Sequence, residues 1–300
     1  MFQVAAAYRI LCLNAALANV GLPPLSEVDR VAAIMAPKHP LVIFFALAYA
    51  WAWLVFIPTV IFHAPPQWIS VATFGPTVAA LITHRITTGS YRAFRIYTTW
   101  PQTIVALVVG VALMIVAYVV LPGIMTADPR KLHWSILIST AVYNYSTLLG
   151  GPLGEEPGWR GYALPRLENT FGPVGGSLLL GLLWAGWHLP LFFYSGWTTA
   201  PIWIYVIFLQ GQSFILTYGA NLAGYGVVVP IAMHATFNTV SRFLNGLFAS
   251  TQPHARIPFE LVMALSGLAM AVVLILATRG QLAHRKDSSL IARVETPSLH

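Results

Sequence analysis

LVIFFALAYAWAWLVFIPTVIF, residues 41–62, carries no charged side chain and is about as long as a helix that crosses a bilayer core. Similar apolar windows recur along the 300 residues, of which 57% are hydrophobic and 8% charged. None of them shows the two-residue alternation of a strand, and lipid tolerates only helices or closed barrels. The sequence therefore predicts an all-α, polytopic membrane protein.

We expect about eight transmembrane helices in one bundle, which form a membrane domain over residues 41–280. A poorly specified N-terminal extension, residues 1–40, precedes this domain, and a cytoplasmic tail, residues 281–300, follows it. The spans are expected near residues 41–62, 68–84, 102–122, 134–151, 174–194, 202–220, 227–247 and 258–278.

Basic residues fall mainly in alternate loops, and such loops stay on the cytoplasmic side of a membrane. We therefore expect an integral protein of a bacterial plasma membrane with both termini in the cytoplasm. Basic residues in these loops also explain the net charge of +7. We therefore expect the protein to contact the lipid bilayer and no nucleic acid. The residues that carry this argument are Arg85, Arg92, Arg95, Arg160, Arg166, Arg279, Arg285 and Lys286.

A second stretch, GEEPGWRGYALPRL at residues 154–167, sets two adjacent carboxylates between apolar runs. Glu156 and Arg160 are four residues apart, so on a helix they share one face and can pair. Glu155 is rotated by about 100° from Glu156 and can point elsewhere. The spacing predicts that Glu156 is held in place and Glu155 is left free to act.

Two further spans carry polar side chains that hydropathy places inside the membrane. LLWAGWHLP supplies His188, and HATFN supplies His234 and Asn238 on one helical face. Each signal alone is weak, because a membrane histidine is often a packing residue and a Glu–Arg pair is often a plain salt bridge. Together they are a hydrolytic set: a carboxylate to activate water, an imidazole to orient water or protonate the leaving amine, and an imidazole–amide pair for the oxyanion.

The same side chains leave a metal alternative open. Glu155, His188 and His234 could hold a catalytic zinc ion with one open position. The sequence has no HExxH motif, and its one cysteine excludes a Cys-based cluster. Asn238 is a poor zinc ligand, so we favour catalysis without a cofactor over a zinc enzyme.

In this order, EEPGWR at residues 155–160, Trp184-xxx-His188 and His234-xxx-Asn238 resemble the three motifs of the CAAX-protease and bacteriocin-processing (CPBP) family, which includes the type II CAAX prenyl endopeptidase. The resemblance covers about residues 135–245, with Trp184 where the family often has phenylalanine. It implies an eight-helix intramembrane endopeptidase whose active site opens towards the cytoplasmic leaflet. It assigns water activation to Glu155, assistance to His188, oxyanion stabilisation to His234 and Asn238, and support to Glu156 and Arg160.

We therefore expect an endopeptidase that cleaves a membrane-associated peptide or protein near the cytoplasmic face. Two alternatives remain open: a non-catalytic immunity or scaffold protein of the same fold, and a proton-coupled transporter. The sequence does not choose among a prenylated C-terminus, a leader peptide and an anti-sigma factor as substrate.

Overall fold

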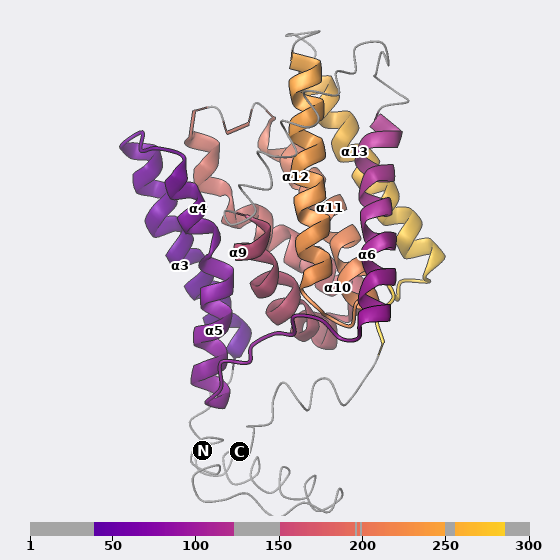
Figure 1. Ribbon diagram of the computed structural model, residues 1–300. Helices are drawn as coiled ribbons and strands as arrows, with labels where there is room; N and C mark the ends of the chain where they lie inside the picture. Colours follow the sequence, from indigo (N-terminus) through magenta and orange to yellow (C-terminus); the bar gives the residue numbers. More distant parts are fainter. Residues whose placement is uncertain (1–38, 123–150, 196, 199, 250–255, 286–300) are drawn as a thin grey trace, which may run out of the picture.

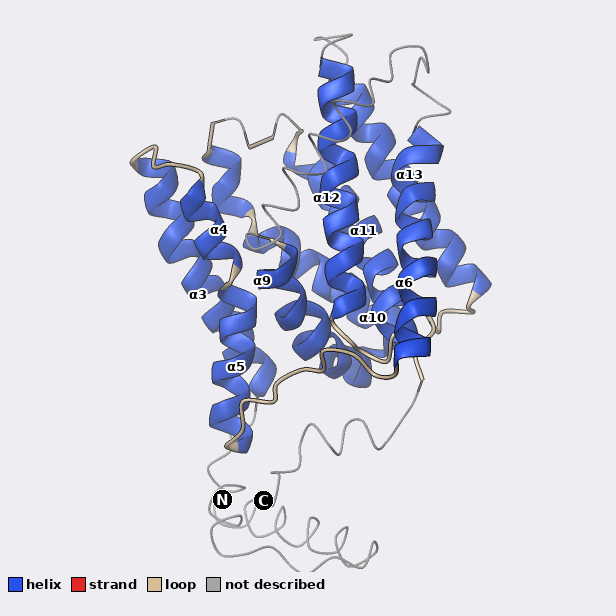
Figure 2. Ribbon diagram, in the orientation of Figure 1, coloured by secondary structure: helices blue, strands red, loops and turns tan. Residues whose placement is uncertain are grey.

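The computed structural model describes residues 39–122, 151–195, 197–198, 200–249 and 256–285. Every regular element in these residues is a helix, which confirms the predicted all-α class for this part of the chain (Figure 2). The elements are α3 (Pro40–Ile61), α4 (Gln67–Thr73), α5 (Gly75–Thr88), α6 (Trp100–Ile115) with a π-helical extension (Val116–Val120), α9 (Pro152–Glu156), a π-helical segment (Pro157–Ala163), α10 (Leu164–Trp187), a 3₁₀ turn (Leu189–Phe193), α11 (Ile202–Leu222), α12 (Val228–Ala249) and α13 (Arg256–Ala277).

Five helical segments are long and apolar enough to cross a membrane, which indicates a polytopic membrane protein. The eight predicted spans are therefore shown only in part. The predicted span at 134–151 lies outside the described residues, as do residues 1–38 and the tail after Arg285, so the division into extension, membrane domain and tail stays a prediction. The five segments are Pro40–Ile61, Trp100–Val120, Pro152–Phe193, Ile202–Leu222 and Glu260–Ala277.

Proline and glycine divide the chain where hydropathy alone predicted continuous helices. The predicted span 68–84 is two helices, α4 of 7 residues and α5 of 14, which meet at Phe74. Pro76 has no backbone N–H to donate back into α4, so the helix is interrupted there. The long segment from Pro152 bends at Gly172, whose φ of 72° lies in the left-handed region that favours glycine.

The bundle is built around α11, which packs against α10, α13, α6 and α12. On the other side, α3 packs against α4 and α5. Between these two groups lies α9, which contacts both α5 and α12 (Figure 1). The stretch with the paired glutamates is therefore in the middle of the bundle.

We call one end of the bundle the basic end, because six of the arginines lie there. Hydrogen bonds between residues far apart in sequence hold this end together. The Val227 N–H donates to the Arg95 carbonyl, and buried Glu168 accepts hydrogen bonds from Asn221 and Tyr225. The described chain also begins and ends here, at His39 and Arg285 (Figure 1). The six arginines are Arg85, Arg92, Arg95, Arg166, Arg279 and Arg285.

Two glycines of the 154–167 stretch let its helix lie directly on the α4–α5 junction. A Cβ atom on Gly154 would come within 2.6 Å of the Thr73 carbonyl oxygen. A Cβ atom on Gly158 would overlap the backbone carbonyl of Pro76. Small residues at such spacing allow close approach of helix backbones in membranes, so these glycines set the position of the glutamates that lie between them.

Replacing Gly158 by alanine is therefore expected to destabilise the fold by about 1–3 kcal/mol, because the backbone it would strike cannot rotate away. The measurement is thermal unfolding of purified protein in lipid. Gly175→Ala is the matched control, since this helical glycine has only the Phe171 Cβ within 4 Å of an added Cβ, at 3.1 Å. Equal stability of the Gly158→Ala and Gly175→Ala variants would contradict the packing argument.

Candidate active site

The paired glutamates lie buried inside the bundle, together with Arg160, which the charge argument had assigned to a cytoplasmic loop. Glu155 is 4% exposed, and Glu156 and Arg160 are fully buried. The helix continues past them as the π-helical segment Pro157–Ala163, a form that is rare and often found at functional sites. Arg160 therefore does not lie in a loop, and it is no evidence for which loops are cytoplasmic.

Two side chains hold Glu156 in place, and its spacing from Arg160 predicted the first of these contacts. Its Oε1 accepts a hydrogen bond from Arg160 Nη1 at 3.1 Å, and it also lies 2.7 Å from His234 Nδ1. The guanidinium has no other hydrogen-bond partner among the described residues, because its Nε and Nη2 are buried and unsatisfied. Glu156 is thus the counter-ion of a buried cation.

Glu155 points away from this ion pair. Its Oε2 accepts a hydrogen bond from the indole Nε1 of Trp184 at 2.7 Å, while Oε1 makes no hydrogen bond within the described part of the chain. The side chain lines a cavity, whereas Glu156 and Arg160 do not. The two carboxylates therefore divide as the sequence predicted, one held in an ion pair and one open to the cavity.

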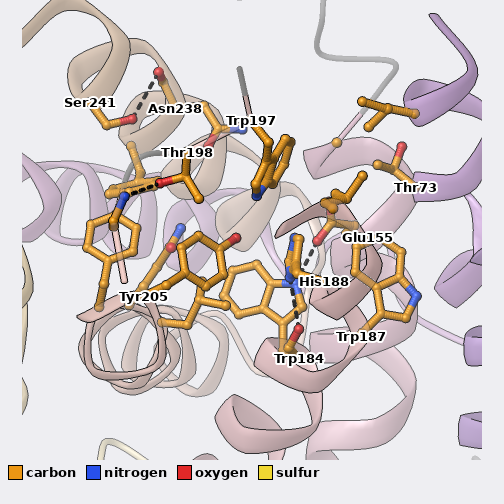
Figure 3. Close-up of a pocket in the computed structure, with 18 of the residues that line it drawn as sticks. Thr73, Glu155, Trp184, Trp187, His188, Trp197, Thr198, Tyr205, Asn238 and Ser241 are labelled. Atoms are coloured by element: carbon orange, nitrogen blue, oxygen red, sulfur yellow. Dashed lines mark hydrogen bonds between the residues drawn. The ribbon is translucent and has the colours of Figure 1, made fainter. Parts of the chain in front are cut away.

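Trp184 connects the members of the site, a role that the sequence did not reveal beyond its place one turn before His188. Its carbonyl lies 2.8 Å from His188 Nδ1, and its indole N–H binds Glu155 (Figure 3). Its ring packs edge-on against the imidazole of His234 at 5.4 Å, and the Arg160 guanidinium carbon lies 4.4 Å from the ring centre. Trp184 thus contacts four polar side chains, three through its ring system and His188 through its backbone carbonyl.

His188 follows the last residue of α10, at the helix end rather than inside a span that reaches residue 194. Pro190 accounts for the early end, because proline cannot donate to the helix and restricts the residue before it. The Trp184 carbonyl can only accept, so His188 Nδ1 carries the proton and the neutral ring leaves Nε2 as an acceptor. The ring also stacks on Trp197 at 6.0 Å.

His234 and Asn238 both face the cavity from α12, as the four-residue spacing predicted. His234 donates from Nδ1 to Glu156, so in the neutral ring Nε2 has a free lone pair. The Ser241 hydroxyl donates to the backbone carbonyl of Asn238 at 3.3 Å, one turn further along α12 (Figure 3). The structure therefore brings an amide and an imidazole together on one wall.

The cavity has a volume of about 650 Å³ and includes side chains that sequence reasoning missed. Gln212 is 1% exposed, and its Nε2 has no partner among the described residues. An amide inside the apolar run of α11 was the available signal for it. Tyr205, Trp187 and Phe208 add aromatic surface to the wall.

The zinc alternative requires Glu155, His188 and His234 to lie close enough to hold one ion, and it stays a prediction. The described residues contain no group of three His, Cys, Asp or Glu side chains placed to hold one metal ion. In both candidate histidines Nδ1 has a partner, Glu156 for His234 and the Trp184 carbonyl for His188, which leaves Nε2 as the ring nitrogen with a free lone pair. We derive no step through a metal.

The cavity opens at the end of the bundle opposite the basic end. Its outer wall includes Pro66 at the start of α4, Tyr194, which donates to the Ala64 carbonyl at 3.1 Å, and Glu260 near the start of α13. The cytoplasmic placement of the basic loops and the opening of the site towards the cytoplasmic leaflet both stay predictions.

These features define a class: a helical membrane protein with a cavity that presents carboxylates, two imidazoles and amides. Residues 134–240 match the family described as "Type II CAAX prenyl endopeptidase Rce1-like". This match confirms, over the part of the chain that carries the three motifs, the resemblance to the CPBP family.

One curated relative shows how far the similarity extends. The chain is 32% identical over 75 residues to "CAAX prenyl protease 2" of Methanococcus maripaludis. This alignment covers 25% of the chain and 26% of the relative, so it spans about a quarter of the length of each.

Proposed function

We propose that the protein is an intramembrane endopeptidase in which Glu155 activates a water molecule. The observation that carries this proposal is the different state of two adjacent carboxylates. Glu156 is occupied by Arg160 and His234, whereas Glu155 has one oxygen held by Trp184 and the other open to the cavity. A carboxylate held in this way can take a proton from water without losing its position.

In the proposed reaction, Glu155 removes a proton from water, and the resulting hydroxide adds to the carbonyl carbon of the scissile peptide bond. His188 Nε2 is an acceptor and suits the orientation of that water. The Asn238 amide donates to the oxyanion that forms on the carbonyl oxygen. The protonated Glu155 then gives its proton to the leaving amine as the C–N bond breaks.

His234 can assist at the oxyanion only in its doubly protonated form. Because Nδ1–H already points to Glu156, Nε2 donates a hydrogen bond only when it gains a second proton. Glu156 then stabilises the imidazolium charge, as it does that of Arg160. Glu156 thus takes part in the proposed reaction, by stabilising the charge on His234, as well as in the fold, by pairing with Arg160.

Replacing Asn238 by leucine is expected to lower kcat by about 10²–10³, the usual cost of removing one oxyanion donor. The fold should remain, because the Asn238 side-chain amide makes no hydrogen bond with any of the described residues. The assay is peptide cleavage with thermal unfolding as the check on folding. Thr239→Leu, next to Asn238 but outside the cavity lining, is the control, and equal rates for the two variants would remove Asn238 from the mechanism.

The experiment that tests the function is cleavage of a panel of membrane-anchored peptides by purified protein in lipid, in water enriched in ¹⁸O. We expect products whose new carboxyl terminus carries ¹⁸O, formed by the wild type and not by Glu155→Gln. Equal cleavage by both would assign the activity to a contaminant and refute the proposal.

The two rival functions give different results in the same preparation. A scaffold or immunity protein would leave every peptide intact while remaining folded. A proton-coupled transporter would move protons when substrate is added and produce no fragments. The proposed partners are accordingly a membrane-associated polypeptide substrate and the bilayer.

A further inference from the structure

We propose that Gln212 is a substrate-binding residue, whose side-chain amide forms hydrogen bonds with a main-chain peptide group of the bound polypeptide. Gln212 lines the cavity from α11 and is 1% exposed. The proposal rests on the proposed function in one respect, that the occupant of the cavity is a polypeptide. It assigns Gln212 to binding and not to the step that breaks the bond.

The amide of Gln212 lacks a partner within the described part of the chain. Its Nε2 is buried and makes no hydrogen bond there. Burying an amide without a hydrogen bond costs free energy, and polar residues inside membrane helices are typical of functional sites. Rotation about the last side-chain torsion exchanges the amide oxygen and nitrogen, so Gln212 can present either its acceptor or its donor to a ligand in the cavity.

Gln210 shows how a buried glutamine differs when it has only a packing role. It is also buried, and neither its Nε2 nor its Oε1 has a partner among the described residues. It lies against α10, where a Cβ atom on Gly181 would come within 2.7 Å of its Oε1, and it is not among the described residues of the cavity wall. The two glutamines therefore share their chemistry and burial, and only Gln212 lines the cavity.

The face of α11 that lines the cavity also contacts the groups proposed for the reaction. The Tyr205 ring packs against the His188 imidazole at 5.6 Å (Figure 3), and Phe208 packs at 5.0 Å against Phe237 of α12, the helix that carries the proposed oxyanion donor. Gln212 is seven residues beyond Tyr205, about 10 Å along the helix axis. An extended polypeptide covers that distance in about three residues. We therefore expect Gln212 to meet a peptide group within about three residues of the scissile bond.

A main-chain peptide group suits the Gln212 amide in two ways. A carboxamide has a donor and an acceptor side by side, as has a peptide group, so the two can form a pair of hydrogen bonds. The cavity wall next to Gln212 on α11 is apolar, with Phe208 and Leu209, so a peptide group that enters it loses its bonds to water. Gln212 would replace that water whatever side chains the substrate carries.

The test is a double-substitution cycle between Gln212 and the peptide backbone. One change is Gln212→Met, which removes the amide and keeps an unbranched side chain of similar volume. The other replaces one main-chain N–H at a time by an ester oxygen, in the fluorescent membrane-anchored peptide of the panel that binds most tightly. Dissociation constants are measured in lipid in the Glu155→Gln background, so that the bound peptide stays intact.

We expect Gln212→Met to weaken binding by about tenfold, the effect of losing hydrogen bonds in a site without water, and to leave the unfolding temperature unchanged. One ester position should weaken binding by a similar factor when Gln212 is present and have no effect in Gln212→Met. Gln210→Met is the matched control and should bind like the parent. Should Gln212→Met fail to fold, Gln212→Asn, which shortens the reach of the amide by one methylene group, is held to the same criteria.

Three results would overturn the role of Gln212. They are equal affinity of Gln212→Met and its parent, ester effects that do not depend on Gln212 at any position, and no binding of any peptide of the panel. In the background that retains Glu155, KM should rise with kcat unchanged. A fall in kcat at unchanged KM would make Gln212 an oxyanion donor and would also contradict the proposal.

Failure of this proposal and failure of the protease function give different results. Binding that depends on Gln212, in a protein whose wild type cleaves no peptide, would refute the protease and keep Gln212 as a binding residue. Cleavage by the wild type, with Gln212→Met binding as tightly as its parent, would refute the role of Gln212 alone.

Discussion

Replacing Glu155 by glutamine is expected to lower kcat for peptide cleavage by about 10²–10⁴, the range that a positioned general base contributes. Glutamine has the same shape, and its carbonyl oxygen can still accept the indole hydrogen bond of Trp184 that now holds Glu155 Oε2. It cannot take a proton from water. The thermal unfolding curve should therefore match that of the wild type, and KM should change little.

Glu260→Gln is the matched control for this prediction, because Glu260 is a second carboxylate in the wall of the same cavity. We expect this variant to cleave at a rate near that of the wild type. If Glu260→Gln lost activity and Glu155→Gln kept it, the general base would have to be placed at the mouth of the cavity.

Replacing Arg160 by methionine is expected to destabilise the fold by about 3–5 kcal/mol, the cost of leaving one partner of a buried ion pair uncompensated. Arg160 and Glu156 are both fully buried, and Arg160 Nη1 donates to Glu156 Oε1 at 3.1 Å. Methionine fills a similar volume but leaves the carboxylate with His234 alone. Loss of the folded protein at moderate temperature, measured by thermal unfolding in lipid, is the expected outcome.

A double substitution separates charge from packing in this result. In Glu156→Gln/Arg160→Met no buried charge is left without a partner, and the glutamine oxygen can still accept from His234 Nδ1. The double variant should therefore be more stable than Arg160→Met. A double variant that is less stable than the single one would show that Arg160 acts through its packing on Trp184 and not through the charge of Glu156.

Short-range spacing predicted the part of the site that depends on one helix turn. The pairing of Glu156 with Arg160 and the shared face of His234 and Asn238 follow from residues four apart, and the structure has both. The link through Trp184 could not be predicted in this way. It joins a residue of α10 to Glu155, which is 29 positions away in sequence.

Hydropathy predicted the helical class but not where the helices break. The end of α10 at Trp187, the bend at Gly172 and the division of α4 from α5 depend on single proline and glycine residues inside apolar runs. Such residues interrupt some membrane helices and are accommodated in others, because neighbouring groups can satisfy the freed backbone. The direction in which the cavity opens depends on tertiary packing, so motif order and loop charge could not reveal it.

The most direct test of the central claim compares two isosteric substitutions at adjacent positions, Glu155→Gln and Glu156→Gln, in the same cleavage and thermal-unfolding assays. The account predicts that Glu155→Gln abolishes cleavage and leaves the unfolding temperature unchanged. It predicts that Glu156→Gln lowers the unfolding temperature sharply, because buried Arg160 loses its counter-ion. A stable Glu156→Gln variant, together with a Glu155→Gln variant that still cleaves, would contradict the assignment of the two carboxylates.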